Sequence, residues 1–173
     1  MLGKFVYSNP TKLYFGENSL ENLPQELACY GKNVMLVYGG GSIKKNGIYE
    51  NVVKLLRDGG KTVFEDAGVM PNPTLEKLYE GCRIAKENKV DLIPSAGCGS
   101  VCDYAKAVSV SAYCEPDPWE NYYLRREAVD HKIITVGCVL ASVGTGSEMN
   151  GGSGTPNHAA KDKSGRVIGE TVY

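Results

Sequence analysis

Short apolar runs alternate along this chain with longer stretches in which apolar residues recur every three or four positions. The runs 33–38, 61–65, 90–95 and 132–136 are short and rich in Val, Ile and Leu, which is typical of buried strands. Strands separated by helices of this length predict an α/β fold, with a parallel sheet and helices on both faces. Three helices are predicted, because three groups of residues have the spacing of one helix face: Ile48, Val52, Leu55 and Leu56; Leu75, Leu78, Cys82 and Ala85; Val101, Ala105 and Val108.

The N-terminal part of the chain carries signals for two strands and a helix. Residues 5–7 and 12–15 flank Asn9-Pro10, which predicts two short strands joined by a turn. Asn18 and Glu21 have the spacing of a capping box, and Pro24 favours a helix that begins near it and ends at Gly31. The remaining expectations are a loop over 67–73, an irregular connection with a short helical turn from residue 116, a featureless stretch over 151–154 and a terminal strand over 166–173.

Three loops of small residues directly follow predicted strands: 39–42, 97–100 and 144–147. In a parallel sheet the ligand lies at the carboxyl ends of the strands, so these loops belong at one edge. In the second loop, Gly97 and Gly99 remove side chains where a ligand touches backbone, and Ser100 suits the N-cap of the next helix. That helix start would face a phosphate. An ordinary strand–turn–helix connection also uses Gly and Ser, but three converging loops favour a nucleotide site.

Composition narrows the class of protein. The chain has 173 residues, of which 42% are apolar and 23% charged, and its formal net charge is −1. Residues 1–173 are therefore expected to form one globular domain, and the absence of a basic stripe argues against a nucleic-acid partner. No apolar run approaches the about 18 residues of a membrane span, and no signal-peptide pattern opens the chain, so a cytoplasmic location is expected.

Cysteines and histidines give no metal motif. The six cysteines include no Cys-x-x-Cys pair, and the two histidines, His131 and His158, are far apart in sequence. Cys98 and Cys102 lie one helical turn apart near a helix start, where a thiolate could be favoured. Reduced, unreactive thiols are the simpler interpretation.

Together these features resemble the iron-containing (group III) alcohol dehydrogenases, in their butanol dehydrogenase branch. The resemblance runs from about residue 5 to residue 173, with the marks in one order and spacing. It implies a Rossmann-like, dehydroquinate synthase-like N-terminal domain that binds NAD(P), followed in the family by a C-terminal helical domain that residues 1–173 lack. The marks are the stretch 38–47, Pro71-Asn72-Pro73, Gly97-Cys98-Gly99-Ser100 with Asp103 and Lys106, and Thr145-Gly146-Ser147-Glu148.

The resemblance also implies roles for individual residues. Gly97, Cys98, Gly99 and Ser100 would hold the pyrophosphate, with Asp103 on the nicotinamide-ribose side. The adenosine ribose would lie along Gly39, Gly40, Gly41 and Ser42, with Asn72 nearby, and the nicotinamide near Thr145 and Ser147. Because no acidic residue stands in the first loop and Lys44 and Lys45 follow it, NADP(H) is slightly preferred over NAD(H). The sequence departs from the family turn at Cys98, which puts a side chain at its second glycine, and at Pro94 in the preceding strand.

The implied reaction is the oxidation of an alcohol or the reduction of an aldehyde with NAD(P). The family's metal, Fe or Zn, is held by one aspartate and three histidines that lie beyond this sequence, so no catalytic or metal-binding residue is assigned here. A truncated homologue that serves only as a nucleotide-binding or oligomerisation module is the alternative, and a related lyase or polyol dehydrogenase is a weaker one. Apolar surface left exposed on such a half-length chain also predicts a homo-oligomer.

Overall fold

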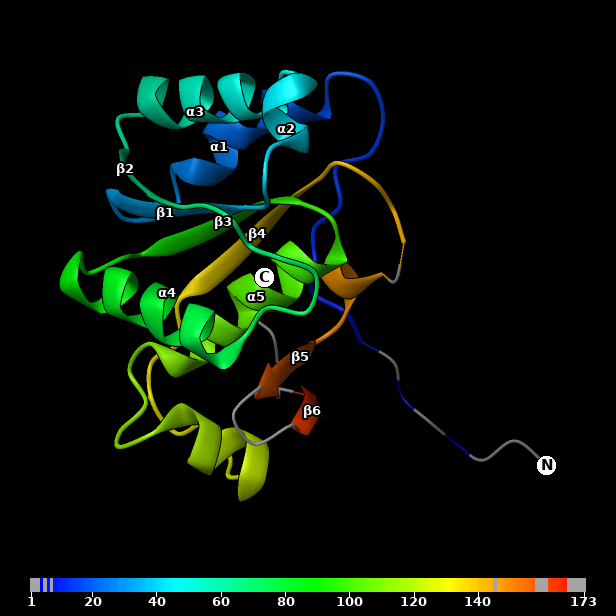
Figure 1. Cartoon of the computed structure of the whole chain (residues 1–173). Helices are drawn as coiled ribbons and strands as arrows, with labels where there is room; N and C mark the ends of the chain where they lie inside the picture. Colours follow the sequence, from blue (N-terminus) through cyan, green and yellow to red (C-terminus); the bar gives the residue numbers. More distant parts are fainter. Residues whose placement is uncertain (1–3, 5, 7, 145, 158–161, 168–173) are drawn as a thin grey trace.

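The centre of the fold is a four-stranded parallel sheet. The computed structural model describes residues 4, 6, 8–144, 146–157 and 162–167. The strand order is β2-β1-β3-β4, and all three neighbouring pairs run parallel, which confirms the predicted α/β class (Figure 1). The strands are β1 (Asn33–Tyr38), β2 (Thr62–Asp66), β3 (Leu92–Gly97) and β4 (Thr135–Leu140).

Helices cover both faces of this sheet. In Figure 1, α1, α2 and α3 lie above it, and α4 and α5 lie below. The helices are α1 (Leu23–Leu27), α2 (Ser42–Lys45), α3 (Ile48–Asp58), α4 (Leu75–Glu87) and α5 (Gly99–Ser111), with the shorter turns η1 (Ser19–Asn22), η2 (Trp119–Leu124) and η3 (Ser147–Met149). The helical spacing read from the sequence predicted α3, α4 and α5.

The core consists of two clusters divided by the sheet. Along β1, Met35 and Val37 face the α4–α5 side, whereas Val34, Leu36 and Tyr38 face the α1–α3 side. All five are buried, because a central parallel strand is covered on both faces. Each buried side chain of this size contributes about 1.5–3 kcal/mol of hydrophobic stabilisation.

A buried polar network joins β2 to α4 and α5. The Lys77 ammonium pairs with the Asp66 carboxylate, and the Tyr104 hydroxyl donates to that carboxylate over 2.5 Å. Burial, together with the Asp66 charge, raises the pKa of Tyr104. A Cβ at Gly81 would lie 2.2 Å from the Tyr104 oxygen, so only glycine lets α4 approach α5 this closely.

Pro94 stands inside β3, where a backbone donor is missing. It pairs with Gly137 of β4, but the register between β1 and β3 skips Ile93 and Pro94 and resumes at Ser95. A proline cannot donate to the ladder, so the sheet accommodates it by interrupting the pairing on one side. The residue stays buried in the strand.

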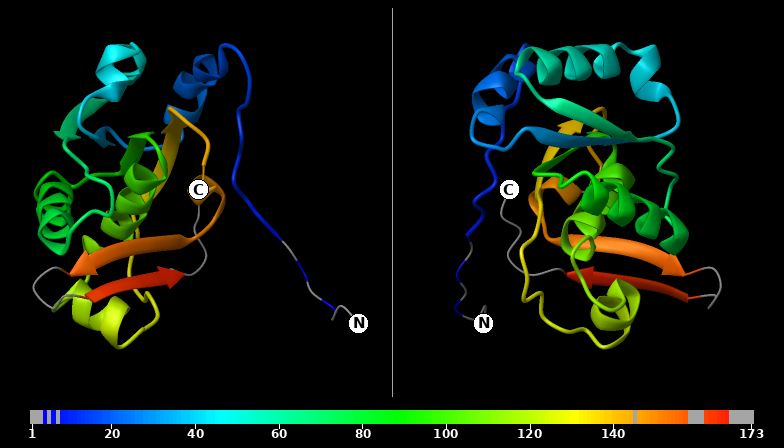
Figure 2. Two further views of the ribbon diagram at one scale, coloured as in Figure 1. Left: turned by 45° about the vertical axis from the view of Figure 1, so that its right-hand side comes forward. Right: turned by 90° about the vertical axis from the view of Figure 1, so that its left-hand side faces the viewer.

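The expectation for residues 151–154 was wrong. They are not featureless, since β5 (Gly152–Asn157) pairs antiparallel with β6 (Asp162–Val167) in a separate hairpin. Figure 2 shows this hairpin beside the main sheet rather than in it. The Ser153 hydroxyl donates to the Asp103 carbonyl of α5 over 2.9 Å, which attaches β5 to the helix. The predicted terminal strand overlaps β6 at residues 166–167, and residues 168–173 lie outside the described residues.

The N-terminal expectations were also partly wrong. Residues 12–15 form no strand, and they are attached to α1 by side chains instead, because both Lys12 (2.8 Å) and Tyr14 (2.6 Å) donate to Glu26. Of the strand expected over 5–7, Phe5 and Tyr7 lie outside the described residues. The Asn18 side chain makes no cap hydrogen bond, and its backbone is left-handed at φ 60°. A helix does begin beside Pro24, as predicted.

Some strand bounds also differ from those expected. The run 132–136 contains Ile133, Ile134 and Val136, but β4 begins only at Thr135, because the two isoleucines approach the strand from a loop that bonds to α5. The Ile134 amide donates to the Ser109 carbonyl over 3.2 Å, and the Ser109 hydroxyl donates to the Ile134 carbonyl. Side-chain pattern alone does not distinguish such a partly buried loop from a strand.

Candidate nucleotide site at the carboxyl edge of the sheet

The strands that precede the three loops of small residues end at one edge of the sheet, as predicted, although the third loop begins four positions after β4 rather than directly after it. Tyr38 is level with Ala96, and Gly97 is level with Leu140, so β1, β3 and β4 end together. The Ala141 amide donates to the Gly97 carbonyl over 2.9 Å, which joins the ends of β3 and β4. A Cβ at Gly39 would lie 3.9 Å from a Val101 methyl group, so the first loop lies against the start of α5.

Gly97 and Cys98 form the turn that starts α5. A Cβ at Gly97 would lie 2.8 Å from the Val101 methyl Cγ2, so the turn closes tightly over the first turn of the helix. The N-cap is Cys98, not Ser100 as expected, because the helix already begins at Gly99. Helical geometry leaves the Gly99 and Ser100 amides without intrahelical acceptors, and the helix dipole adds positive potential there.

The Cys98 side chain lies on the exposed surface of this turn. Its Sγ lies 3.1 Å from the hydroxyl oxygen of Ser142, which follows β4. The thiol thus links the second loop to the segment that leads into the third. A glycine at this position would remove that link and expose more of the turn's backbone.

The first loop is open on the side away from the sheet. For Gly40 and Gly41, no described atom lies within 4 Å of where a Cβ would stand, and Ser42 is exposed at the first position of α2. Backbone without side chains beside open space is what a ligand needs to make close contact.

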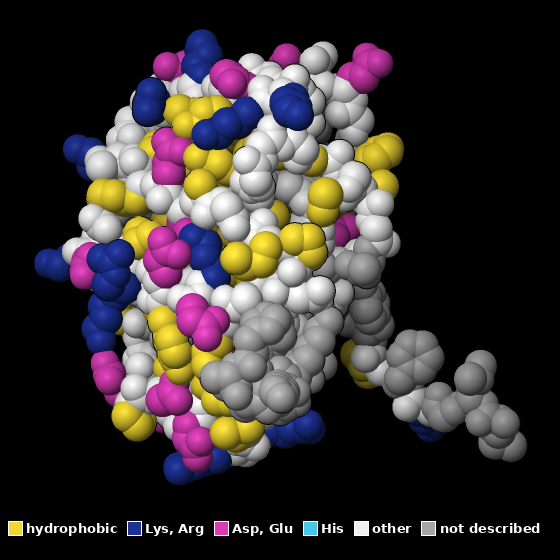
Figure 3. Space-filling model, viewed as in Figure 1, with side chains coloured by type: hydrophobic (Ala, Val, Ile, Leu, Met, Phe, Trp, Pro, Cys, Tyr) yellow, Lys and Arg dark blue, Asp and Glu magenta, His cyan; other side chains and the backbone are white. Residues whose placement is uncertain are grey.

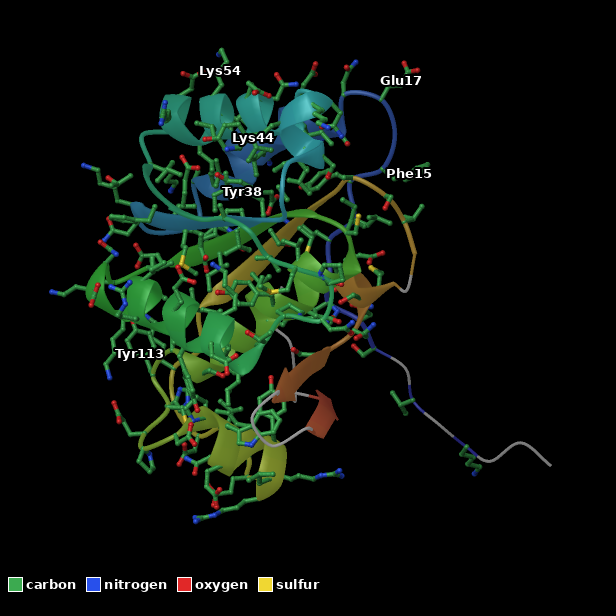
Figure 4. The ribbon with its side chains drawn as sticks, viewed as in Figure 1. Phe15, Glu17, Tyr38, Lys44, Lys54 and Tyr113 are labelled. Atoms are coloured by element: carbon green, nitrogen blue, oxygen red, sulfur yellow. The ribbon has the colours of Figure 1, made fainter. Side chains whose placement is uncertain are left out.

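Lys44, directly after this loop, is held by two aromatic rings. Its Nζ lies 5.0 Å from the centre of the Tyr38 ring and 4.6 Å from that of Tyr49, which are cation–π distances. Figure 4 shows Lys44 near Tyr38, where α2 returns over the end of β1. Both tyrosine hydroxyls donate to Glu65, at 2.6 Å from Tyr38 and 3.0 Å from Tyr49. Burial first, and then this hydrogen bond to Glu65, raise the pKa of each tyrosine.

Asp103 and Ser147, both predicted site residues, are hydrogen-bonded to each other. The Ser147 hydroxyl donates to the Asp103 carboxylate, which also lies 3.2 Å from the Lys106 ammonium. Lys106 was among the family marks but had no assigned role, and its side chain is only 2% exposed. It donates to the Ser147 carbonyl (2.9 Å) and the Asn150 carbonyl (3.1 Å), so it fixes η3 against α5. The spacing of Asp103 and Lys106, one turn apart, was the available signal.

Asn72 and Thr145 are the two remaining predicted site residues. Asn72 lies in the loop after β2 with a left-handed φ of 53° and an exposed side chain. The carboxyl end of β2 lies at the same sheet edge as the three loops. Thr145 lies outside the described residues, so its predicted place near the nicotinamide stays a prediction.

In the described part of the chain, no three His, Cys, Asp or Glu side chains gather closely enough to hold a metal ion. His131 makes contacts within the protein, with its Nε2 2.5 Å from the Tyr122 hydroxyl, and His158 lies outside the described residues. Within the described ranges, no helix has the length and apolarity needed to cross a membrane.

Charged groups of both signs alternate over the described surface seen in Figure 3. Lys and Arg side chains lie beside Asp and Glu side chains on that face. This agrees with the formal net charge of −1. A long basic stripe of the kind that follows a nucleic-acid backbone is not present on that described face.

The family model, the curated relatives and the solved structures all point to the same protein family. The family model for iron-containing alcohol dehydrogenases matches residues 10–171. The chain is 45% identical to a probable NADH-dependent butanol dehydrogenase 1 of Bacillus subtilis, over 93% of this chain and 41% of that protein. It is 34% identical to the NADPH-dependent aldehyde reductase YqhD of Escherichia coli, over 94% and 41%. The crystal structure of NADH-dependent butanol dehydrogenase A from Thermotoga maritima superposes with a TM-score of 0.90 at 39% identity, over 98% of this chain and 42% of that one.

The fold is therefore the Rossmann-like α/β sheet found in the N-terminal part of those enzymes. The chain belongs to the iron-containing alcohol dehydrogenase family, as the sequence motifs indicated. It spans about two fifths of the length of the curated relatives that it matches. Those relatives use NADH or NADPH according to their names.

Proposed function

We propose that residues 1–173 form one NAD(P)(H)-binding α/β domain, with the cofactor at the edge where the three loops meet. The observation that carries the proposal is the tight Gly97 turn. It opens α5 between the first loop and the end of β4, in a chain of a dehydrogenase family. The reaction served is the reduction of a small aldehyde or the oxidation of an alcohol. When bound, the nicotinamide supplies or accepts the hydride.

The chain's own residues bind and orient the cofactor. The Gly99 and Ser100 amides at the start of α5 donate to the pyrophosphate, and the absence of a side chain at Gly97 keeps the turn short. Gly39, Gly40, Gly41 and Ser42 contact the adenosine ribose, with Asn72 on the adenosine side. Asp103 and Ser147, held rigid by Lys106, lie toward the nicotinamide end together with Thr145.

We further propose that the site accepts a 2′-phosphate, with NADP(H) slightly preferred. Supporting this is Lys44, whose ammonium is fixed near the first loop by Tyr38 and Tyr49. Glu65 accepts hydrogen bonds from the hydroxyls of both rings, and its carboxylate balances the charge of Lys44 when NAD(H) is bound. Lys45 is exposed in the same helix and provides a matched comparison.

A metal ion, Fe or Zn, polarises the substrate oxygen in the family chemistry that the resemblance implies. The described residues do not fit such an ion, because they bring no three ligand side chains together. No step of the proposed mechanism is therefore assigned to a metal on this chain.

We place the chain in the cytoplasm, and the six free thiols support a reducing compartment.

Titration of NADPH and NADH, followed by cofactor fluorescence, tests the proposal. Saturable binding is expected for both, and a Gly40→Trp variant should abolish it, because the indole takes up space beside the first loop, where no described atom lies within 4 Å of the Cβ position. Absence of saturation at millimolar cofactor would refute the site.

A second titration tests the 2′-phosphate preference. Lys44→Met should weaken NADPH binding by about tenfold and NADH binding little, while Lys45→Met should change the ratio of the NADPH and NADH dissociation constants less. Equal losses for both cofactors would refute the NADP(H) preference.

A second candidate function is an oligomerisation module. Large apolar side chains are exposed along the N-terminal segment: Val6 at 96%, Leu13 at 63% and Phe15 at 91%. Figure 4 shows Phe15 pointing away from the fold. Such surface favours self-association, so we propose a homo-oligomer. Light scattering on the chain and on a Leu13→Ser, Phe15→Ser double variant tests it, with a smaller species expected for the variant and a monomer in both cases refuting it.

A further inference from the structure

Two thiols from distant parts of the chain touch beneath the candidate nucleotide site. The Sγ atoms of Cys102 and Cys138 lie 3.2 Å apart, although 36 positions separate them in sequence. Cys102 is in the first turn of α5 and is fully buried, whereas Cys138 is in the middle of β4 and is partly exposed. None of the site's proposed roles uses either thiol.

We propose that Cys102 and Cys138 form an intramolecular disulfide when the protein meets hydrogen peroxide. A disulfide has an S–S length of about 2.05 Å, so the sulfur atoms need to approach by only about 1 Å. The other cysteines do not offer this arrangement among the described contacts: the Cys98 thiol faces the Ser142 hydroxyl, and the Cys114 thiol accepts from Asn121.

The surroundings assign different roles to the two thiols. The hydrogen bond from Cys102 lowers the pKa of Cys138; burial and the Glu148 charge oppose this, whereas the Ser95 hydroxyl and the Lys106 charge assist it. The same contact, together with burial, raises the pKa of Cys102. Cys138 is also the less buried residue of the two. It is therefore the nucleophile, and Cys102 is the resolving thiol.

The chemistry balances with a peroxide as the only oxidant. The Cys138 thiolate attacks one peroxide oxygen, the O–O bond breaks, and the leaving hydroxide takes a proton to become water, which leaves a sulfenic acid. The Cys102 thiol then attacks that sulfur, an S–S bond forms, and the sulfenic hydroxyl leaves with the Cys102 proton as a second water. Two thiols are oxidised and one peroxide is reduced to two waters.

This bond would join the first turn of α5 to β4 directly below the Gly97 turn. Neither element could then shift without the other, since the link adds a covalent tie next to the Ala141–Gly97 hydrogen bond. The inference does not depend on the proposed cofactor, because it requires only the two thiols and the oxidant. It is an oxidative modification site in the fold itself.

Peptide mapping after peroxide treatment tests this. Remaining thiols are blocked with iodoacetamide under denaturing conditions, and trypsin then releases Cys102 within peptide 90–106 and Cys138 within a peptide that begins at residue 133. Because peptide 90–106 also holds Cys98, the experiment is run in a Cys98→Ser background. We expect one cross-linked pair of these peptides, lighter by two hydrogens and separable by reductant.

Cysteine variants test which thiols form the cross-link. Cys102→Ser and Cys138→Ser should each abolish the cross-link, whereas Cys29→Ser, at an exposed thiol far along the chain, should leave its yield unchanged. Should Cys102→Ser fail to fold, the map of the Cys98→Ser protein alone decides. A cross-link that disappears in the Cys98→Ser background would overturn the proposal, as would oxidation confined to Cys29 with Cys102 and Cys138 both recovered alkylated.

Discussion

The Lys106 ammonium lies 2.9 Å from both the carbonyl and the hydroxyl oxygen of Ser147, 41 positions further along the chain. These bonds attach η3, and with it the third loop, to the middle of α5. A buried lysine of this kind is stable only because every neighbouring acceptor is directed at it, including the Asp103 carboxylate at 3.2 Å. One side chain thus organises one wall of the candidate site.

Replacement of that lysine is the first prediction. Lys106→Met keeps the length of the side chain but removes the charge that faces Asp103, which retains only the Ser147 hydroxyl among these donors, and it leaves two carbonyl oxygens without the ammonium. We expect a loss of about 2–4 kcal/mol in the free energy of unfolding, measured by urea denaturation. Lys54→Met is the matched control, because its pair with Asp58 is exposed and should contribute less than about 1 kcal/mol. Similar losses in the two variants would contradict the anchoring role.

The second prediction concerns the turn before α5. An alanine at Gly97 would place a Cβ 2.8 Å from the Val101 methyl group, so the helix start has to shift. Gly97→Ala should destabilise the protein by about 1–3 kcal/mol and weaken NADPH binding, as measured by denaturation and by fluorescence titration. Gly40→Ala is the control, since no described atom lies within 4 Å of its Cβ position, and it should stay within about 0.5 kcal/mol of the parent. A Gly97→Ala protein as stable as Gly40→Ala would show that the turn relaxes freely.

Strands with a continuous apolar pattern were the easiest to predict from sequence. β1 was predicted with its observed bounds, because Val34 through Tyr38 are all apolar and a glycine follows. The hairpin of β5 and β6 was missed, because Gly and Ser in β5 give no alternation and the strand is defined by its partner. The position of β4 was wrong by three residues at its start, since the partly buried loop before it carries isoleucines of the kind that a strand also carries.

The candidate site was predictable to the extent that it depends on backbone. The three loops could be placed at one edge because parallel topology alone requires it. What could not be read from sequence was the environment of charged and thiol groups. Lys106 is buried through contacts with residues 147 and 150, and Cys102 meets Cys138 across a packed helix and strand. Such pairings exist only once the tertiary structure has formed.

A third prediction follows from Glu26, which fixes the N-terminal segment. The Lys12 hydrogen bond, followed by that of Tyr14, lowers the pKa of Glu26 below its ordinary value of 4.5. A carboxylate with a depressed pKa stabilises the folded state above its unfolded value, and this contribution is lost as the pH falls through the folded value. Glu26→Gln should therefore lower the free energy of unfolding at neutral pH, measured by urea denaturation, and the difference from the parent should vanish in acid. Glu17→Gln, at an exposed position in the same region, should show no such difference.

The last prediction tests the departure at Cys98 from an all-glycine turn. The thiol occupies the N-cap of α5 and contacts Ser142, so it covers backbone that a pyrophosphate would approach. Cys98→Gly removes this cover at little cost to the helix, because glycine is an acceptable N-cap. We expect NADPH to bind with a roughly three- to tenfold lower Kd, up to about 1.4 kcal/mol, in a fluorescence titration. Cys29→Gly, at another exposed cysteine, is the control and should not change the Kd. An unchanged or higher Kd for Cys98→Gly would show that the cofactor approaches the turn from a side that the thiol does not cover.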